Sequence, residues 1–329
     1  MKHIIMTGPK TSVVADMPDV KPSCDQILIR LRYVGVCMSE HYDWSNAREG
    51  MAFGHEPMGV VEEAGKNVIG FSVGDRVSGS WGGSLPGSGG MVEYAVADPK
   101  KDIVVKIPGN IRDEDAILEP LSCMMSAVSK VNCPMPGTDV CVVGAGYMGC
   151  GLISLLKLRG AHVIAIDIRP ESLANAKKYG ADEVYSADEA KVKFLANPTP
   201  YGGFDVVMEW GETNESLDLA INLTNECGRL CVGAYHTGPK RLVDMQQLGV
   251  KAIDLLNTHP REWNLSAAGA RNAVRLLSSG EWKYANLPVK VYPMSGFDQA
   301  HAELETKYGK YMKALIDMSR IDGEPYIIK

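Results

Sequence analysis

Three residues between positions 37 and 56 have the types and spacing of a metal-centred catalytic site. Cys37 is followed, after residues 38–54, by the adjacent pair His55 and Glu56. A thiolate, an imidazole and a carboxylate are all zinc ligands, and three protein ligands that leave one position open describe a catalytic zinc ion. A buried cysteine is more often inert packing, so these three residues alone leave both interpretations open.

The residues around this trio form a much longer pattern. The run Gly54-His55-Glu56-Pro57-Met58-Gly59 is followed by Gly65, by Val68 and by Gly74-Asp75-Arg76-Val77, and Gly35-Val36 precede the cysteine. The pattern resembles the zinc signature of the medium-chain alcohol dehydrogenases. The resemblance covers essentially the whole chain and is specific for metal and cofactor but weak for substrate. It implies a zinc-dependent oxidoreductase that transfers a hydride between NAD and a secondary alcohol or ketone, with zinc acting as a Lewis acid.

A second carboxylate bears on the metal and on the substrate. Glu119 stands in Leu118-Glu119-Pro120, and a proline within a helix opens it locally, which lets Glu119 point into a cleft. In the family this place holds a cysteine ligand or, in polyol and threonine dehydrogenases, a Glu-Pro pair. The resemblance therefore implies that Glu119 and Glu56 are zinc ligands or near-ligands, and which of them completes the resting site stays open. An exposed helix glutamate is the alternative for Glu119.

The proton released on oxidation needs a path away from the substrate. Ser39 occupies the place of the family's relay hydroxyl, although a serine there is also a common turn residue. The histidine that often ends the relay is replaced by Tyr42, so either the neighbouring His41 or water takes its role. Glu40 stands where the family usually has an aspartate behind the metal ligands.

We expect one zinc ion per subunit. Many relatives bind a second, structural zinc ion through four cysteines in one loop, but this chain has no cysteine between Cys37 and Cys123. The glycine- and serine-rich segment 78–90 takes the place of that loop, which leaves Trp81 as a wall of the substrate pocket or as a loop anchor. Four nearby residues could also line a polar substrate pocket, although a solvent-exposed loop explains each of them equally well: Trp44, Asn46, Arg48 and Glu49.

The second half of the chain carries a dinucleotide-binding pattern. The apolar run 140–143 leads into Gly144-Ala145-Gly146-Tyr147-Met148-Gly149, and a second apolar run ends at Asp167. Glycines allow a tight turn and a close approach of pyrophosphate to a helix N-terminus, and an acidic residue at this distance binds the adenosine ribose. Asp167 favours NAD over NADP, whereas Arg169 could pair with a 2′-phosphate. The predicted cofactor-binding residues are Gly144, Gly146, Tyr147, Met148, Asp167, Ile168 and Arg169.

The order of the elements predicts an α/β protein with two architectures. Short strand-like segments fill the first 120 residues, and strands alternate with helices after them. We expect a GroES-like, mostly antiparallel β-barrel catalytic domain at 1–123, completed by 264–329, and a Rossmann domain with a doubly wound, six-stranded parallel sheet at 124–263. Helices are predicted at 113–131 (interrupted by Pro120), 171–179, 188–196, 213–223, 266–279 and 296–306.

Composition narrows the choice of partners. The 329 residues carry a net charge of −6 and a pI near 5.7, which argues against binding to nucleic acid or to an anionic membrane. The short apolar start and the lack of an 18-residue apolar stretch predict a cytoplasmic protein. An apolar edge strand at Ala252–Leu256 predicts a homodimer or homotetramer, because unpaired strand edges tend to associate.

Three alternatives to a polyol or sugar dehydrogenase stay open at this point. One is an amino-alcohol dehydrogenase of the threonine type. Another is a zinc-free quinone reductase or a non-catalytic NADPH-binding relative, against which the presence of Cys37 and His55 weighs. The last is a metal-stabilised binding module without turnover.

Overall fold

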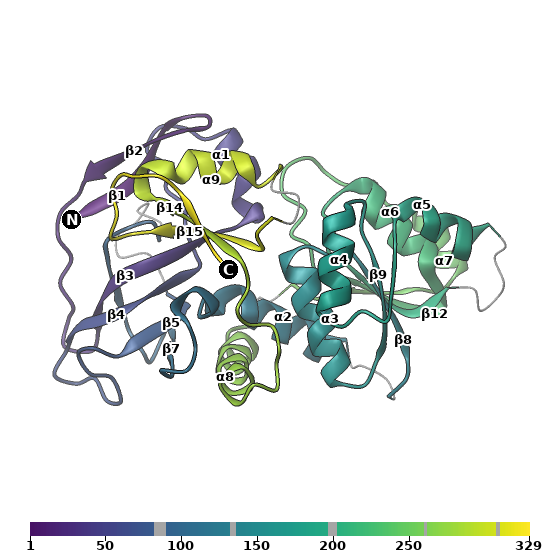
Figure 1. The fold of residues 1–329 in the computed structure, drawn as a ribbon, viewed down its shortest axis with the longest axis horizontal. Helices are drawn as coiled ribbons and strands as arrows, with labels where there is room; N and C mark the ends of the chain where they lie inside the picture. Colours follow the sequence, from purple (N-terminus) through teal and green to yellow (C-terminus); the bar gives the residue numbers. More distant parts are fainter. Residues whose placement is uncertain (82–89, 132–135, 197–202, 260–261, 307–309) are drawn as a thin grey trace.

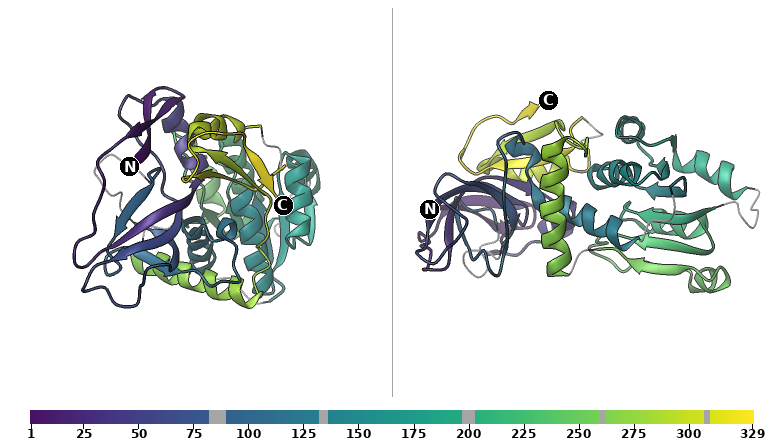
Figure 2. Two further views of the ribbon diagram at one scale, coloured as in Figure 1. Left: turned by 60° about the vertical axis from the view of Figure 1, so that its left-hand side comes forward. Right: turned by 90° about the horizontal axis from the view of Figure 1, so that it is seen from below.

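The computed structural model describes residues 1–81, 90–131, 136–196, 203–259, 262–306 and 310–329. These residues form two lobes that lie side by side (Figure 1). The amino- and carboxyl-terminal segments, purple and yellow, share one lobe, and the teal and green middle of the chain forms the other (Figure 2).

The first lobe is built around one long strand, β3. It pairs with β4, β6 and β15, all antiparallel. Its inward side chains alternate with exposed ones over the first half, as expected for a strand with one buried face. β3 ends at Val36 and β4 begins at Pro57, so the two central strands bring Cys37 and Glu56 to the same end of the sheet. The lobe contains β1 (Lys2–Gly8), β2 (Thr11–Asp16), β3 (Ile27–Val36), η1 (Met38–Glu40), α1 (His41–Ser45), β4 (Pro57–Ala64), β5 (Arg76–Ser80), β6 (Tyr94–Ala97), β7 (Ile103–Lys106) and η2 (Asp113–Asp115).

The end of the chain returns to this sheet. Residues Lys313–Asp317 form β15, which pairs with β3 on one side and with β14 on the other. β14 and β15 are the parallel pair in an otherwise antiparallel sheet, whose order is β16-β14-β15-β3-β4-β5-β7. The returning segment contains β14 (Val289–Pro293), η4 (Met294–Gly296), α9 (Phe297–Glu303), β15 (Lys313–Asp317) and β16 (Tyr326–Ile328).

The second lobe contains the predicted six-stranded parallel sheet. Its order, β10-β9-β8-β11-β12-β13, reverses direction between β8 and β11, which confirms a doubly wound sheet. Helices cover it on both faces (Figure 1), and its inner strands β8 and β9 are accordingly almost continuous apolar runs. The elements are β8 (Asp139–Val143), α3 (Tyr147–Leu158), β9 (His162–Ile166), α4 (Pro170–Lys178), β10 (Glu183–Tyr185), α5 (Ala187–Ala190), η3 (Lys191–Leu195), β11 (Phe204–Glu209), α6 (Asn214–Leu223), β12 (Thr224–Val232), α7 (Met245–Val250) and β13 (Asp254–Asn257).

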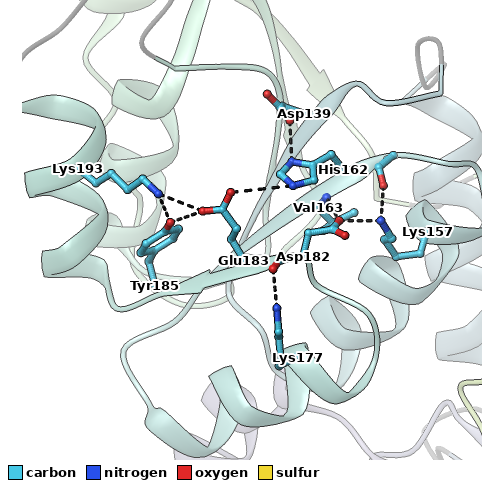
Figure 3. A network of polar contacts seen from close by, with 10 residues as sticks. Asp139, Lys157, His162, Val163, Lys177, Asp182, Glu183, Tyr185 and Lys193 are labelled. Carbon is cyan, nitrogen blue, oxygen red and sulfur yellow. Dashed lines mark hydrogen bonds and ion pairs between the residues drawn. The ribbon is translucent and has the colours of Figure 1, made fainter.

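A polar network joins the starting ends of three neighbouring strands of this sheet (Figure 3). His162, the first residue of β9, lies 2.8 Å from Asp139 on β8 and 4.0 Å from Glu183 on β10. These side chains are substantially exposed, so the network contributes little stability. It lies at the edge opposite the one where the strands end and where the cofactor motif begins.

Two long helices lie between the lobes. α2 (Leu118–Lys130) packs against α8 (Trp263–Ser279) and α3, and it also contacts β4 and β5. The prediction that Pro120 interrupts a helix at 113–131 is wrong. The acidic triplet Asp113–Asp115 forms the separate turn η2, and Pro120 is the third residue of α2. In the first turn of a helix the missing N–H of a proline removes no intrahelical hydrogen bond.

Several local features differ from the prediction. The helix expected at 188–196 consists of a short α-helix, α5, followed by the π-helical turn η3, and the helix α7 was not anticipated. Most of the glycine- and serine-rich segment 78–90 lies outside the described residues. Within the described part of the chain, no helix combines the length and hydropathy that a membrane span requires.

Candidate metal and cofactor site

The three residues with metal-ligand spacing come together at one end of the barrel sheet. The ligand atoms of Cys37, His55 and Glu56 all lie within 4.8 Å of one another, the one such group of three or more found among the described residues. Cys37 follows β3 and Glu56 precedes β4, so strand pairing itself sets their separation. Glu56 is buried, while Cys37 and His55 are half-buried and face a more open side.

A glutamate behind the trio orients its histidine. Oε1 of Glu40 lies 2.8 Å from Nδ1 of His55 and also accepts a hydrogen bond from the Gly54 N–H. This leaves Nε2 of His55 on the side of Cys37. Burial by itself lowers the pKa of His55, but its hydrogen bonds to Cys37 and Glu40 outweigh burial and raise that pKa to about 12. The site therefore favours positive charge before any metal binds.

A buried lysine supplies part of that charge. Nζ of Lys313 lies 2.7 Å from Oε1 and 2.6 Å from Oε2 of Glu56, and 5.1 Å from the ring centre of Tyr147. Burial tends to lower the pKa of Lys313, but the Glu56 carboxylate more than compensates, and its pKa is raised. Space for the carboxylate comes from Gly35, where a Cβ would overlap Oε2 of Glu56.

Glu119 lies near the trio without joining it. It is the second residue of α2, and its Oε1 accepts a hydrogen bond from Sγ of Cys123, 3.3 Å away and one turn further along the helix. Burial raises the pKa of Glu119 and raises that of Cys123 well above its usual value. The charge of His55 opposes this rise in the pKa of Glu119, and the charge of Glu56 adds to it.

The residues present fit a catalytic zinc ion. Sulfur, imidazole nitrogen and carboxylate oxygen are the donors that zinc takes, at bond lengths of about 2.0–2.3 Å. Donors within 4.8 Å of one another can share one tetrahedral centre at those lengths. The hydrogen bond from Glu40 gives the histidine ligand the orienting partner that such ligands normally have.

The predicted relay residues lie on the segment between Cys37 and α1. Oγ of Ser39 donates to Sγ of Cys37 at 3.2 Å, which places the hydroxyl beside the candidate ligand. Nε2 of His41 contacts Oε1 of the exposed Glu305 at 2.7 Å. Tyr42 reaches the other lobe, since a Cβ on Gly238 would lie 2.6 Å from its ring.

Trp44 lies in the core and not in a substrate pocket or a solvated loop. Trp44 is 3 % exposed, belongs to the core of the first lobe and donates from Nε1 to Asp298. The indole is the largest apolar side chain of the short helix α1, and burial of this surface outweighs a place in the pocket. Arg48 and Glu49 are exposed, and Asn46 caps α1 by bonding the Tyr42 carbonyl. Trp81 is half-buried against the same core.

The glycine motif forms a cradle at the start of α3. Gly144 has φ +95° and approaches the Trp210 backbone too closely for a side chain, and a Cβ on Gly149 would overlap the Gly144 carbonyl. A Cβ on Gly146, by contrast, would meet only Nη2 of Arg169, at 3.7 Å. Gly146 therefore faces open space at a helix N-terminus, as a pyrophosphate-binding loop requires.

The remaining predicted cofactor residues surround this cradle. Asp167 follows β9, is 6 % exposed and accepts a hydrogen bond from the Ala145 N–H within the glycine loop. Ile168 beside it is 79 % exposed. Tyr147 and Met148 are half-buried at the first turn of α3, and the ring of Tyr147 lies against Lys313.

Sequence reasoning missed two residues of the site. Lys313 interrupts the otherwise apolar run 311–316, and a charge among buried residues needs a partner; this signal could have identified Lys313. Cys123 lies four residues after Glu119 on one helix, so the two side chains share a face. Neither pattern names its partner, because Glu56 is 257 residues away from Lys313.

Both lobes of this chain resemble known proteins. The family model for the alcohol dehydrogenase GroES-like domain matches residues 23–109, and that for zinc-binding dehydrogenases matches residues 148–275. A sorbitol dehydrogenase of Halalkalibacterium halodurans is 24 % identical over 96 % of this chain and 99 % of its own. D-xylulose reductase A of Aspergillus oryzae is 26 % identical over 91 % of each. The structure of a thermostable alcohol dehydrogenase from Pyrobaculum aerophilum is 27 % identical, with a TM-score of 0.77 over 96 % of this chain and 99 % of that one.

The fold and the ligand trio thus define a zinc-type dehydrogenase with a GroES-like lobe and a Rossmann lobe. The chain belongs to the medium-chain zinc-dependent alcohol dehydrogenase family and is an oxidoreductase. The cofactors of this family are a catalytic zinc ion and NAD, and the chain keeps a fitting site for each.

Proposed function

We propose that this enzyme interconverts a secondary alcohol and a ketone in a polyol or sugar-type substrate, with NAD as the hydride carrier. The observation that carries the proposal is two carboxylates, the buried Glu56 within the ligand trio and the half-buried Glu119 near it, together with Cys37 as the one sulfur ligand. Relatives named for sorbitol and D-xylulose support the same substrate class. The ligand trio argues against a zinc-free reductase, and a threonine-type amino alcohol is the second substrate class that we test.

The ligand roles that we propose follow from the geometry. Cys37 and His55 hold zinc, and Glu56 or Glu119 completes the site. When bound, zinc supplies Lewis acidity toward the substrate oxygen, and NAD supplies the hydride acceptor. Lys313 holds Glu56 by both carboxylate oxygens, so this carboxylate is drawn toward β15 when Glu119 serves the metal.

The proton of the substrate hydroxyl leaves through the segment after Cys37. Ser39, whose Oγ lies beside Sγ of Cys37, takes the proton from the substrate. His41 is held by Glu305, whose carboxylate is 63 % exposed, and this pair passes the proton to solvent. Water is the alternative carrier between Ser39 and the surface.

The cofactor lies across the end of the parallel sheet. Gly144 and Gly146 leave room for pyrophosphate, Asp167 takes the adenosine ribose, and Tyr147 and Met148 line the path toward the metal. We further propose that residues 1–123 and 264–329 form the catalytic domain and residues 124–263 the NAD-binding domain. We also propose that the enzyme is a homodimer or a homotetramer and that it acts in the cytoplasm.

The test is a substrate panel with the zinc-loaded enzyme. Polyols, sugars, simple secondary alcohols and threonine are offered with NAD, and NADH formation is followed by its absorbance. We expect turnover of a polyol or sugar and one zinc ion per chain by elemental analysis. Oxidation of threonine without oxidation of any polyol overturns the substrate assignment, and active protein without zinc overturns the metal assignment. Cys37→Ser should lose zinc and activity together, whereas Cys24→Ser, at an exposed cysteine, should lose neither.

A further inference from the structure

The carboxylate of Asp167 is already fully hydrogen-bonded within the chain. Oδ1 accepts from the Arg169 backbone N–H and from Nε of Arg169, both at 2.9 Å. Oδ2 accepts from the Ala145 N–H and from Nη2 of Arg169, also at 2.9 Å. A carboxylate offers about four lone-pair positions, so none is left for a ribose hydroxyl while the guanidinium stays in place.

The Arg169 guanidinium occupies the cofactor cradle itself. It bonds Asp167 as a two-pronged fork, the strongest geometry for such a pair. Its Nη2 is also the nearest atom to the space above Gly146, at 3.7 Å from a Cβ there. The Arg169 side chain is 33 % exposed and Asp167 is 4 % exposed, so the cation lies between the carboxylate and the solvent-facing entry.

Two consequences follow for a bound dinucleotide. A ribose with both hydroxyls free must displace two hydrogen bonds of the guanidinium before it can bond Asp167. A ribose with a 2′-phosphate meets a guanidinium whose fork matches phosphate as well as carboxylate. The repulsion that an isolated aspartate exerts on that phosphate is cancelled, because the pair carries no net charge.

We propose that Arg169 determines the cofactor selectivity of this dehydrogenase, and that the Asp167–Arg169 pair admits NADP alongside NAD. The inference rests on the proposed place of Asp167 at the adenosine ribose. It goes beyond the assignment of NAD, because it names a residue that weakens the usual exclusion of the 2′-phosphate. In the NADP complex Arg169 lies between the Asp167 carboxylate and the 2′-phosphate, and in the NAD complex it gives up its side-chain hydrogen bonds to Asp167.

The experiment measures binding and needs no turnover. Zinc-loaded protein is titrated by calorimetry with NAD⁺, NADP⁺ and the fragments ADP and 2′,5′-ADP, which isolate the ribose subsite. The variants are Arg169→Leu, Arg169→Lys and Asp167→Ser. Lys178→Leu, an exposed cation on the following helix α4 without contact to Asp167, is the matched control for loss of one charge. Thermal melting of each variant checks that it is folded.

For wild type we expect dissociation constants for NAD⁺ and NADP⁺ that differ by less than about tenfold. Arg169→Leu should weaken the binding of NADP⁺ and 2′,5′-ADP by about tenfold or more, because a charge-assisted contact is lost. The same variant should bind NAD⁺ and ADP as tightly as wild type or more tightly. Arg169→Lys should keep part of the NADP⁺ affinity, and Asp167→Ser should favour NADP⁺ further. Lys178→Leu should change the affinity for neither cofactor.

Two results overturn the proposal. One is a wild-type preference for NAD⁺ far above tenfold, or a ratio of the two affinities that Arg169→Leu leaves unchanged. The other is an equal loss of both cofactors in Arg169→Leu, which would give Arg169 only a structural role. Failure of the polyol assignment would leave all these affinities as predicted, so the two proposals fail separately.

Discussion

Lys313 and Glu56, which are 257 residues apart in the sequence, form a buried ion pair. The lysine Nζ lies 2.7 and 2.6 Å from the two carboxylate oxygens, and the two side chains are 7 % and 1 % exposed. Glu56 belongs to the ligand trio and Lys313 to the last long strand of the first lobe. The pair thus ties the returning carboxyl-terminal segment to the metal site.

Replacing Lys313 with methionine should destabilise the metal-free protein strongly. It leaves the Glu56 carboxylate buried without its partner, and breaking a buried pair on one side costs about 3–5 kcal/mol. Urea unfolding of chelator-treated protein measures the loss. Lys100→Met removes an exposed partner of Asp25 and should cost no more than about 1 kcal/mol. Equal losses in the two variants would show that the Lys313 pair is not specially coupled to the fold.

Glu119 should affect the metal and leave the cofactor alone. We expect Glu119→Ala to lower turnover or zinc affinity by about 10–100-fold, as changes around a metal ligand do, with unchanged NAD affinity. Glu119→Gln keeps an oxygen and the shape, so it separates charge from geometry. Metal content, steady-state rates and NAD titration are compared with Glu63→Ala, at an exposed glutamate of β4. Wild-type zinc and rate in both Glu119 variants would reduce Glu119 to a packing residue and remove the main support for a polyol substrate.

His301 should make stability depend on mildly acidic pH. Neither ring nitrogen has a hydrogen-bond partner among the described residues, and the ring is stacked on Trp44. Burial, with a smaller effect from His41, lowers the pKa of His301 to about 3.

The sign of this effect follows from proton binding. Between pH 6.5 and 3, His301 binds a proton in the unfolded chain but stays neutral in the folded chain. The contribution of His301 to stability is therefore fully present above pH 6.5 and is lost as the pH falls below it. The loss from pH 6.5 to 5 should be about 2 kcal/mol. Urea midpoints over this range measure it; His301→Leu should flatten the dependence, and His162→Leu, at a half-exposed histidine, should not. An unchanged slope in His301→Leu would assign the effect to other groups.

Self-association should depend on the exposed edge of the parallel sheet. β13 is the last strand in the sheet order, and Leu255 on it is 48 % exposed. Light scattering at micromolar concentration should give a dimer or a tetramer for wild type. A charge at the edge opposes pairing, so Leu255→Lys should lower the mass, whereas Ile69→Lys, 90 % exposed on the other lobe, should not. A monomeric wild type contradicts the prediction.

The order of elements and the identity of the metal and cofactor motifs were determined by the sequence alone. These features are local: a buried parallel strand is a continuous apolar run, and the turn at Gly144 requires a residue without a side chain. Such signals need only neighbours within a few residues, so the six-stranded sheet could be predicted from them. The trio of Cys37, His55 and Glu56 was predicted because the longer pattern around it resembles a known family.

Only the tertiary structure decided which groups share the buried site and what charge they carry there. Glu56 meets Lys313 because β15 returns beside β3, and no local pattern encodes that pairing over 257 residues. Trp44 entered the core and Arg169 closed on Asp167 for the same reason: burial and hydrogen bonding depend on which surfaces meet. A sequence shows that a charge needs a partner, and only the packed chain selects the partner, since a buried charge is stabilised by the groups that folding brings within about 3 Å of it.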